Sequence, residues 1–360
     1  MLDRTILTEL SRREFGRRAL AVGGALAFEA KGSPMGSSGE GARDPLWFVA
    51  PELRPFYKSL LPRIAKVPPL NSRTLGLWRR MEFAAASFGT IPIDKRIIAG
   101  RRGSEVAVYV LNAKGGASRP GILHMHGGGF VMGSAAYCLT SLQSLAFALD
   151  AAIVTVEYRL APETHWSGSL EDNYTALRWL HDNSHELGVD SRRVAVMGES
   201  AGGGHAALLT IAARDRGELP IAFQCLTYPM LDDRTGSTRR VKPPIGTLIW
   251  NSAENRFGWT AFLGREAGRL KESLGVPARS KSLAGLPPAW MAIGSIDLFI
   301  EETIEYAKRL VEANVFTELH VIPGAYHGFD GAVGTPLVKN FNNARIDALK
   351  RGLGASASQS

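Results

Sequence analysis

The chain has 360 residues, of which 45% are hydrophobic and 21% are charged, and its formal net charge is +8. This is ordinary globular composition without internal repeats, and a core of this size needs no stabilising disulfide framework. Lysine and arginine are spread along the chain, which indicates a solvated basic surface and no nucleic-acid partner. The two cysteines, Cys138 and Cys225, have no metal-binding spacing, and no apolar run is long enough for stable membrane insertion.

The first 40 residues differ in composition from the rest of the chain. A basic cluster with Ser-Arg-Arg-Glu-Phe at residues 11–15 precedes a short apolar stretch, Ala19 to Phe28, and a tail rich in glycine and serine. This order resembles a twin-arginine leader, which implies export to the periplasm or beyond. The alternative is a disordered basic arm, or an extra amphipathic helix, on a cytoplasmic protein.

From residue 91 onwards, short apolar runs rich in β-branched residues alternate with segments of helical periodicity. The predicted strands are EVAVYVLNA (105–113), GILHM (121–125), AAIVTVEYR (151–159), RVAVMG (193–198), FQCLTYP (223–229), AWMAIGS (289–295) and TELHVIPG (317–324). The predicted helices span residues 134–149, 167–187, 201–216 and 301–314. Apolar strands separated by helices indicate an α/β fold whose mostly parallel central sheet is covered by helices on both faces.

Two segments interrupt this alternation, at residues 44–90 and 230–285. Both carry several aromatic residues, and we expect them to form helical additions outside the sheet. We therefore predict a leader over residues 1–40 and one α/β domain over residues 41–360.

In a sheet of this kind the chemistry lies beyond the carboxyl ends of the strands. Three strand ends carry Ser200, Asp297 and His327, in that order along the chain. Nucleophile, acid and base follow one another in this order in the α/β-hydrolase triad.

Ser200 lies in the sequence Gly-Glu-Ser-Ala-Gly, between an apolar strand and a helix. A nucleophile on such a sharp turn has a strained backbone, and the residues two positions before and after it crowd each other. Glycine therefore fits at both of those positions, Gly198 and Gly202, and we interpret Ser200 as a nucleophile.

The base is chosen among eight histidines. A general base must reach the serine hydroxyl from a loop at a strand end, and only His126 and His327 stand in such a position. The others lie within predicted strands or helices or just before a helix: His124, His165, His181, His185, His205 and His320. His126 opens a glycine loop that we expect it to brace, so we predict that His327 is the base.

The acid that would orient this base is predicted to be Asp297. It lies at the end of the preceding strand, 30 residues before His327, where its carboxylate can accept the second ring N–H. Its rivals are Asp330, close to the histidine in sequence, and Asp232 and Asp233, at an earlier strand end.

Three consecutive glycines follow His126 at the end of the GILHM strand. Backbone N–H groups can approach a reacting carbonyl oxygen closely only where side chains are absent. Gly128 and Gly129, with Ala201 directly after the nucleophile, are therefore predicted to form an oxyanion hole. A phosphate-binding loop would require a lysine that this stretch lacks.

Together these motifs resemble the hormone-sensitive lipase family of bacterial esterases. The matching residues are His126–Phe130, Tyr158–Glu163, Gly198–Gly203, Asp297–Leu298 and His327–Phe329, and the resemblance spans about residues 45–350. Family members more often have aspartate or threonine where Glu199 stands.

The resemblance implies an α/β-hydrolase with a cap built from the two added segments. It also implies a serine carboxylesterase that hydrolyses short- to medium-chain esters without metal or cofactor, through an acyl-enzyme intermediate. The small ester substrate is the expected partner, and a homodimer is left open. An amidase or lactam hydrolase on the same triad is the first alternative, and a ligand-binding receptor on the same scaffold is the second.

Overall fold

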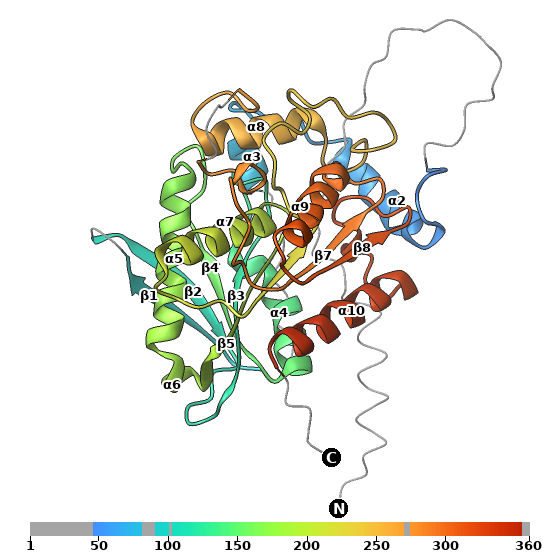
Figure 1. The fold of residues 1–360 in the computed structure, drawn as a ribbon. Coiled ribbons are helices and arrows are strands. Elements are labelled where there is room, and N and C mark those ends of the chain that lie inside the picture. Colours follow the sequence, from blue (N-terminus) through green and yellow to red (C-terminus); the bar gives the residue numbers. More distant parts are fainter. Residues whose placement is uncertain (1–45, 81–90, 101–102, 270–273, 355–360) are drawn as a thin grey trace, which may run out of the picture.

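The computed structural model describes residues 46–80, 91–100, 103–269 and 274–354 (Figure 1). Its centre is an eight-stranded sheet with the strand order β1-β2-β4-β3-β5-β6-β7-β8. The strands are β1 (Ile93–Ala99), β2 (Glu105–Leu111), β3 (Arg119–Met125), β4 (Ala152–Glu157), β5 (Val189–Glu199), β6 (Phe223–Thr227), β7 (Ala289–Gly294) and β8 (Thr317–Ile322).

The sheet is mostly parallel, which confirms the predicted fold class. β2 runs antiparallel to both of its neighbours, β1 and β4, and all other neighbouring strands are parallel. Each of the seven predicted strands is present. β1 has no counterpart among them, because its sequence IDKRIIA has three charged residues in a row and buries only Ile98.

The helices fall where the sequence predicts them, with two differences. They are α2 (Arg54–Ile64), α3 (Leu75–Arg80), α4 (Leu139–Leu149), α5 (Trp166–Asp182), α6 (Ser184–Leu187), α7 (Ala201–Arg216), α8 (Ser252–Leu263), α9 (Ile300–Glu312) and α10 (Pro336–Gly352). The predicted helix 167–187 is divided at Asn183 into α5 and α6. α10 was not among the predicted helices. The structure also has short 3₁₀ turns, which include η3 (Ala135–Cys138) and η5 (Phe329–Gly331).

Two pairs of helices cover the sheet. α5 packs against α7, and α4 packs against α10. α4 and α5 both contact β4 without contacting each other extensively, which places the two pairs on opposite faces of the same sheet (Figure 1). The central strands are consequently buried on both sides, and β6 and β7 are buried along their entire length.

The two segments predicted to lie outside the sheet contribute α2, α3 and α8. In Figure 1, α3 and α8 both lie at the top of the view, beyond the sheet, and α2 lies closer to β8. Arg79 of α3 connects this region to the sheet loops, because its guanidinium donates to the carbonyl oxygens of Val131 and Ala161, each at 2.7 Å. The predicted leader, residues 1–40, lies outside the described residues, and the division into domains stays a prediction.

No helix in the described part of the chain is both long and apolar enough to cross a bilayer.

Candidate active site

The nucleophile candidate sits on a sharp turn between β5 and α7. Ser200 has φ 58° and ψ −122°, a conformation that is rare for a residue with a side chain. Its backbone N–H donates to Thr227 O at 3.0 Å, and its carbonyl accepts from the N–H of Met230, also at 3.0 Å. These bonds to the end of β6 and to the segment after it fix the strained turn in place.

The glycines on either side of this turn are required by space. A Cβ on Gly198 would lie 2.4 Å from the carbonyl of Gly202, and a Cβ on Gly202 would lie 2.0 Å from the carbonyl oxygen of Met125. Both distances are far below van der Waals contact. The crowding expected from the Gly-x-Ser-x-Gly pattern is therefore present.

Ser200, His327 and Asp297 form a continuous hydrogen-bonded chain. His327 Nε2 lies 2.8 Å from Ser200 Oγ, and His327 Nδ1 lies 2.8 Å from Asp297 Oδ2. The other carboxylate oxygen of Asp297 accepts from the backbone N–H of Phe299 at 2.9 Å. All three side chains are buried. With Nδ1–H donating to the carboxylate, Nε2 is left to accept the serine proton.

The rival acids point to other partners. Asp330 accepts a hydrogen bond from the Tyr228 hydroxyl at 2.7 Å. Asp232 pairs with Arg234 at 2.6 Å, and Asp233 pairs with Arg279, also at 2.6 Å. The structure thus brings Asp297 to His327 and engages the other three carboxylates elsewhere.

The glycine loop lies directly against the serine turn. A Cβ on Gly127 would be 3.4 Å from the Cβ of Ser200. Gly128 and Gly129 have φ of 128° and 58°, which suit glycine. Within the part of the chain that the structure describes, the N–H groups of Gly128, Gly129 and Ala201 donate no hydrogen bond, so they are open to an external acceptor.

His126 braces the loop from behind. Its Nδ1 lies 2.8 Å from Gly127 O, and its ring stacks on Tyr158 with centroids 4.2 Å apart. The Tyr158 hydroxyl also donates to the carbonyl of His126 at 2.6 Å. Burial lowers the pKa of His126 to about 4, so this ring is neutral near pH 7.

A buried polar network next to the nucleophile was missed by the sequence reasoning. Glu199 Oε2 lies 2.8 Å from His124 Nε2, and Arg345 of α10 approaches Oε1 at 3.4 Å. The other ring nitrogen of His124 meets Thr155 Oγ1 at 2.8 Å. Burial alone would raise the pKa of Glu199, but His124 and Arg345 outweigh it and lower that pKa. The available signal was a histidine inside an otherwise apolar strand, which needs a buried partner.

The aromatic side chains near the loop differ in their positions. Phe130 is buried and stacks on Phe262 with centroids 3.9 Å apart, so it belongs to the core. Trp47 is 61% exposed. Trp250 instead lies on the glycine loop, since a Cβ on Gly129 would be 2.3 Å from its Cη2 atom.

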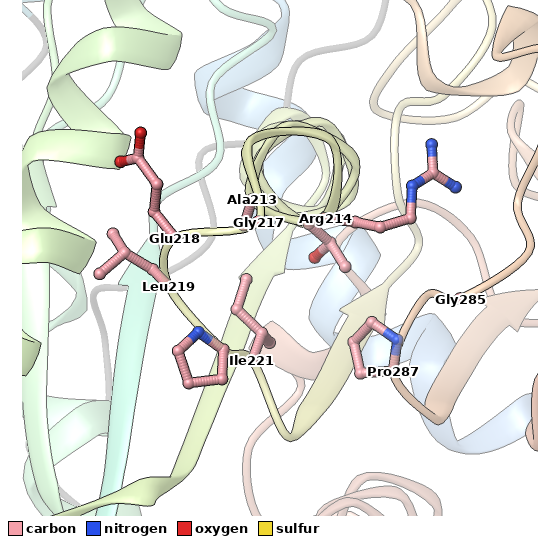
Figure 2. A pocket seen from close by; sticks show the side chains of 10 residues that line it. Ala213, Arg214, Gly217, Glu218, Leu219, Ile221, Gly285 and Pro287 are labelled. Carbon is pink, nitrogen blue, oxygen red and sulfur yellow. The ribbon is translucent and has the colours of Figure 1, made fainter.

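A separate pocket of about 320 Å³ lies at the opposite end of α7. Figure 2 shows Arg214, Glu218 and Pro287 among the residues that line it. Ser200 precedes the first residue of this 16-residue helix, which places the pocket about 24 Å from the serine at 1.5 Å per residue. The pocket therefore takes no part in the serine site.

A buried serine–histidine–aspartate chain at the carboxyl edge of a mostly parallel sheet, with the serine on a strand-to-helix turn, defines an α/β-hydrolase. Over residues 122–331 the sequence matches the profile of a family described by the alpha/beta hydrolase fold. The chain belongs to this family, and its resemblance to the hormone-sensitive lipase group of esterases is confirmed.

The similar proteins are named as esterases. Esterase LipI of Mycobacterium tuberculosis is 34% identical over 238 residues, which are 65% of this chain and 73% of LipI. Carboxylesterase NlhH of the same species is 33% identical over 241 residues, covering 66% of this chain and 75% of NlhH. The structure of a bacterial heroin esterase superposes with a TM-score of 0.73 at 33% identity, over 85% of this chain and 98% of the other.

Proposed function

We propose that this carboxylic ester hydrolase cleaves short- to medium-chain esters with Ser200 as nucleophile, His327 as base and Asp297 as the acid that orients the base. The observation that carries the proposal is the hydrogen-bonded chain of these three side chains, with 2.8 Å at both links to the histidine. Such a chain lets the imidazole take the serine proton while the carboxylate stabilises the resulting imidazolium.

The reaction proceeds in two halves. Ser200 Oγ attacks the ester carbonyl as its proton passes to His327 Nε2, and the imidazolium then protonates the departing alcohol oxygen. This leaves an acyl-enzyme. Water, deprotonated by the same nitrogen, attacks the acyl carbon, and the proton returns to Ser200 as the acid is released.

The negative oxygen that forms in each half is assigned to the N–H groups of Gly128, Gly129 and Ala201. What supports this assignment is their open hydrogen-bonding capacity and the contact of the glycine loop with the serine turn. Donors that are already in position stabilise the oxyanion without reorganising during the reaction.

Replacement of Ser200 tests the nucleophile. Ser200→Ala should lower kcat on p-nitrophenyl butyrate by about 10³-fold or more in a folded protein. A fluorophosphonate should label the wild-type enzyme at Ser200, and EDTA should leave the rate unchanged. Ser144→Ala, an exposed serine on α4, is the matched control and should behave as the wild type.

Three results would count against the proposal. Substantial turnover by Ser200→Ala would exclude the nucleophile. Within a panel of p-nitrophenyl acetate, butyrate, octanoate and laurate, a preference for the longest chain would exclude the chain-length assignment. Faster hydrolysis of matched anilides than of esters would favour the amidase alternative.

A further inference from the structure

We propose that Trp250 is a specificity-determining residue that limits the size of the alcohol group of the ester. This inference rests on the proposed function, because it places the alcohol relative to His327 and Gly129. It assigns to one side chain of the 230–285 segment a role that the triad itself does not have.

Trp250 lies on Gly129 and near His327. The edge of its six-membered ring lies on Gly129, where a Cβ would be only 2.3 Å from Cη2 and 2.7 Å from Cζ2. Its ring centroid is 6.5 Å from that of His327. The indole therefore spans the distance between one predicted oxyanion donor and the predicted base.

The orientation of the indole is fixed by a hydrogen bond to α8. Trp250 Nε1 donates to Asn255 Oδ1 at 3.2 Å, and Asn255 Nδ2 donates to Thr235 O at 2.8 Å. A buried tryptophan that is held through its N–H has its ring fixed in position. The apolar Cζ2–Cη2 edge next to that N–H is the one on Gly129, so the ring acts as a rigid wall.

The reaction geometry decides which part of the ester meets this wall. The carbonyl oxygen must point to the Gly129 N–H, and the alcohol oxygen must come within hydrogen-bond reach of His327 Nε2 to be protonated. The carbon attached to that alcohol oxygen consequently passes between Gly129 and His327, beside the indole. The acyl chain leaves the tetrahedral carbon in a different direction.

A purely supporting role makes a different prediction. α8 also presses on the glycine loop, since a Cβ on Gly258 would be 2.6 Å from Gly129 O. If Trp250 only helped to hold this peptide in place, its loss would lower kcat to the same extent for every ester.

Two substrate series separate these roles in the full-length enzyme. The first varies the alcohol at constant acyl group: ethyl, benzyl and naphthyl acetate. The second varies the acyl group at constant alcohol: ethyl acetate, butyrate and octanoate. Hydrolysis is followed by acid release in a pH-stat. The variants are Trp250→Ala and Trp250→Phe, with Trp290→Phe as the control, since Trp290 is a buried indole on β7 beside His320.

Trp250→Ala should raise the ratio of kcat/KM for naphthyl acetate over ethyl acetate by about tenfold or more, as expected when a wall of this size is removed. Trp250→Phe should give an intermediate rise, and it serves as the test if the alanine variant does not fold. The acyl series should keep its profile, and Trp290→Phe should change neither ratio.

A uniform loss of kcat in both series, or a change confined to the acyl series, overturns the assignment of Trp250. Either result leaves the proposed esterase intact, because that proposal is tested separately, by Ser200→Ala, the p-nitrophenyl ester panel and the anilides.

Discussion

At the scale of single residues, the serine turn shows how backbone strain is maintained by its surroundings. Ser200 has a positive φ, which costs on the order of 1–3 kcal/mol and persists only where neighbouring structure enforces it. Backbone hydrogen bonds to Thr227 and Met230 provide that constraint, and Gly198 and Gly202 remove the side chains that would block it. The hydroxyl is thereby held at the tip of the turn.

The glycine loop gives a first test at this scale. In Gly128→Val, the new Cβ would lie 2.0 Å from Met132 O and the residue would have to keep φ 128°, so the peptide must rotate. Loss of one oxyanion donor should reduce kcat by about 10²–10³-fold. Steady-state kinetics with p-nitrophenyl butyrate measures this reduction in kcat.

Gly116→Ala is the matched control for that change. Gly116 also has a positive φ, of 75°, but open space surrounds its Cβ position, so the variant has the backbone cost without the clash. It should retain kcat. A Gly128→Val enzyme with normal kcat and only a raised KM would show that the loop binds substrate without stabilising the oxyanion.

The identity of the base is tested by the pH dependence. A histidine base must be neutral to accept the serine proton. We expect kcat/KM to fall through a single ionisation as the pH is lowered, because the protonated base can no longer accept that proton. Burial lowers the pKa of His126 to about 4, so that ring would take up a proton only near that pH.

Substitutions complete this experiment. His327→Ala should abolish nearly all turnover, and with it the fall of kcat/KM at low pH. Asp297→Asn should give a folded but strongly impaired enzyme. His126→Ala should keep the fall of kcat/KM at low pH. The assignment is wrong if His126→Ala eliminates turnover in a folded protein while His327→Ala remains active.

Sequence reasoning reached the residues that local motifs mark. Ser200, Asp297 and His327 each follow an apolar strand, and the structure joins them by hydrogen bonds. The partnership of Glu199 with His124 and Arg345 was not predictable in the same way. It depends on which strands are neighbours and on where α10 docks, and the local sequence around Glu199 indicates neither of these.

At the scale of elements, α8 contains a carboxyl group that the fold holds protonated. Glu254 is buried in the first turn, where it forms a capping box with Asn251. Burial raises its pKa from 4.5 to about 8. Between these values the unfolded chain has lost the proton and the folded chain retains it, so stability falls as the pH rises through this window.

Glu254→Gln should remove this dependence. The amide oxygen can still accept from the Asn251 N–H, but the side chain no longer ionises on unfolding. Relative to the variant, the free energy of unfolding of the wild type should fall by about 1.4 kcal/mol per pH unit across this window. The total fall should be on the order of a few kcal/mol by pH 8. Urea unfolding at pH 5, 6.5 and 8 measures the difference.

Glu266→Gln, a substitution of an exposed carboxylate just after α8, is the control and should not alter the pH dependence. If the free energies of unfolding of the wild type and Glu254→Gln differ by the same amount at all three pH values, Glu254 is not protonated in the folded protein.

Element prediction succeeded where burial leaves a strong periodic signal. The strands β4, β6 and β7 are buried along nearly all of their length, and α7 is delimited by Ser200 and Gly217. β1 and α10 lack that signal. β1 is an edge strand with charged residues, and α10 has charged or amide residues over most of its surface, so only tertiary contacts reveal them.

At the scale of the whole molecule, the basic N-terminal sequence predicts where the enzyme acts. We propose export through the pair Arg12-Arg13, because both arginines stand in the order typical of a twin-arginine leader. Replacing both by lysine should move esterase activity from the periplasmic to the cytoplasmic fraction of the expressing cell, measured with p-nitrophenyl acetate.

The second basic pair, Arg17-Arg18, is the natural control for this experiment, because lysine there preserves the charge beside the apolar stretch. That variant should be exported normally. Cytoplasmic activity in the wild type, or equal distribution of all three proteins, would overturn the proposal.

The separation of 127 residues between Ser200 and His327 affects when the enzyme becomes active during synthesis and folding. Because the chain is synthesised from its N-terminus, Ser200 leaves the ribosome 127 residues before His327. Contacts between residues far apart in the sequence must overcome loop-closure entropy before they stabilise the chain, and they form slowly. The nascent chain therefore carries a serine without a proton acceptor, and it gains hydrolytic activity only when β8 and the segment after it have docked.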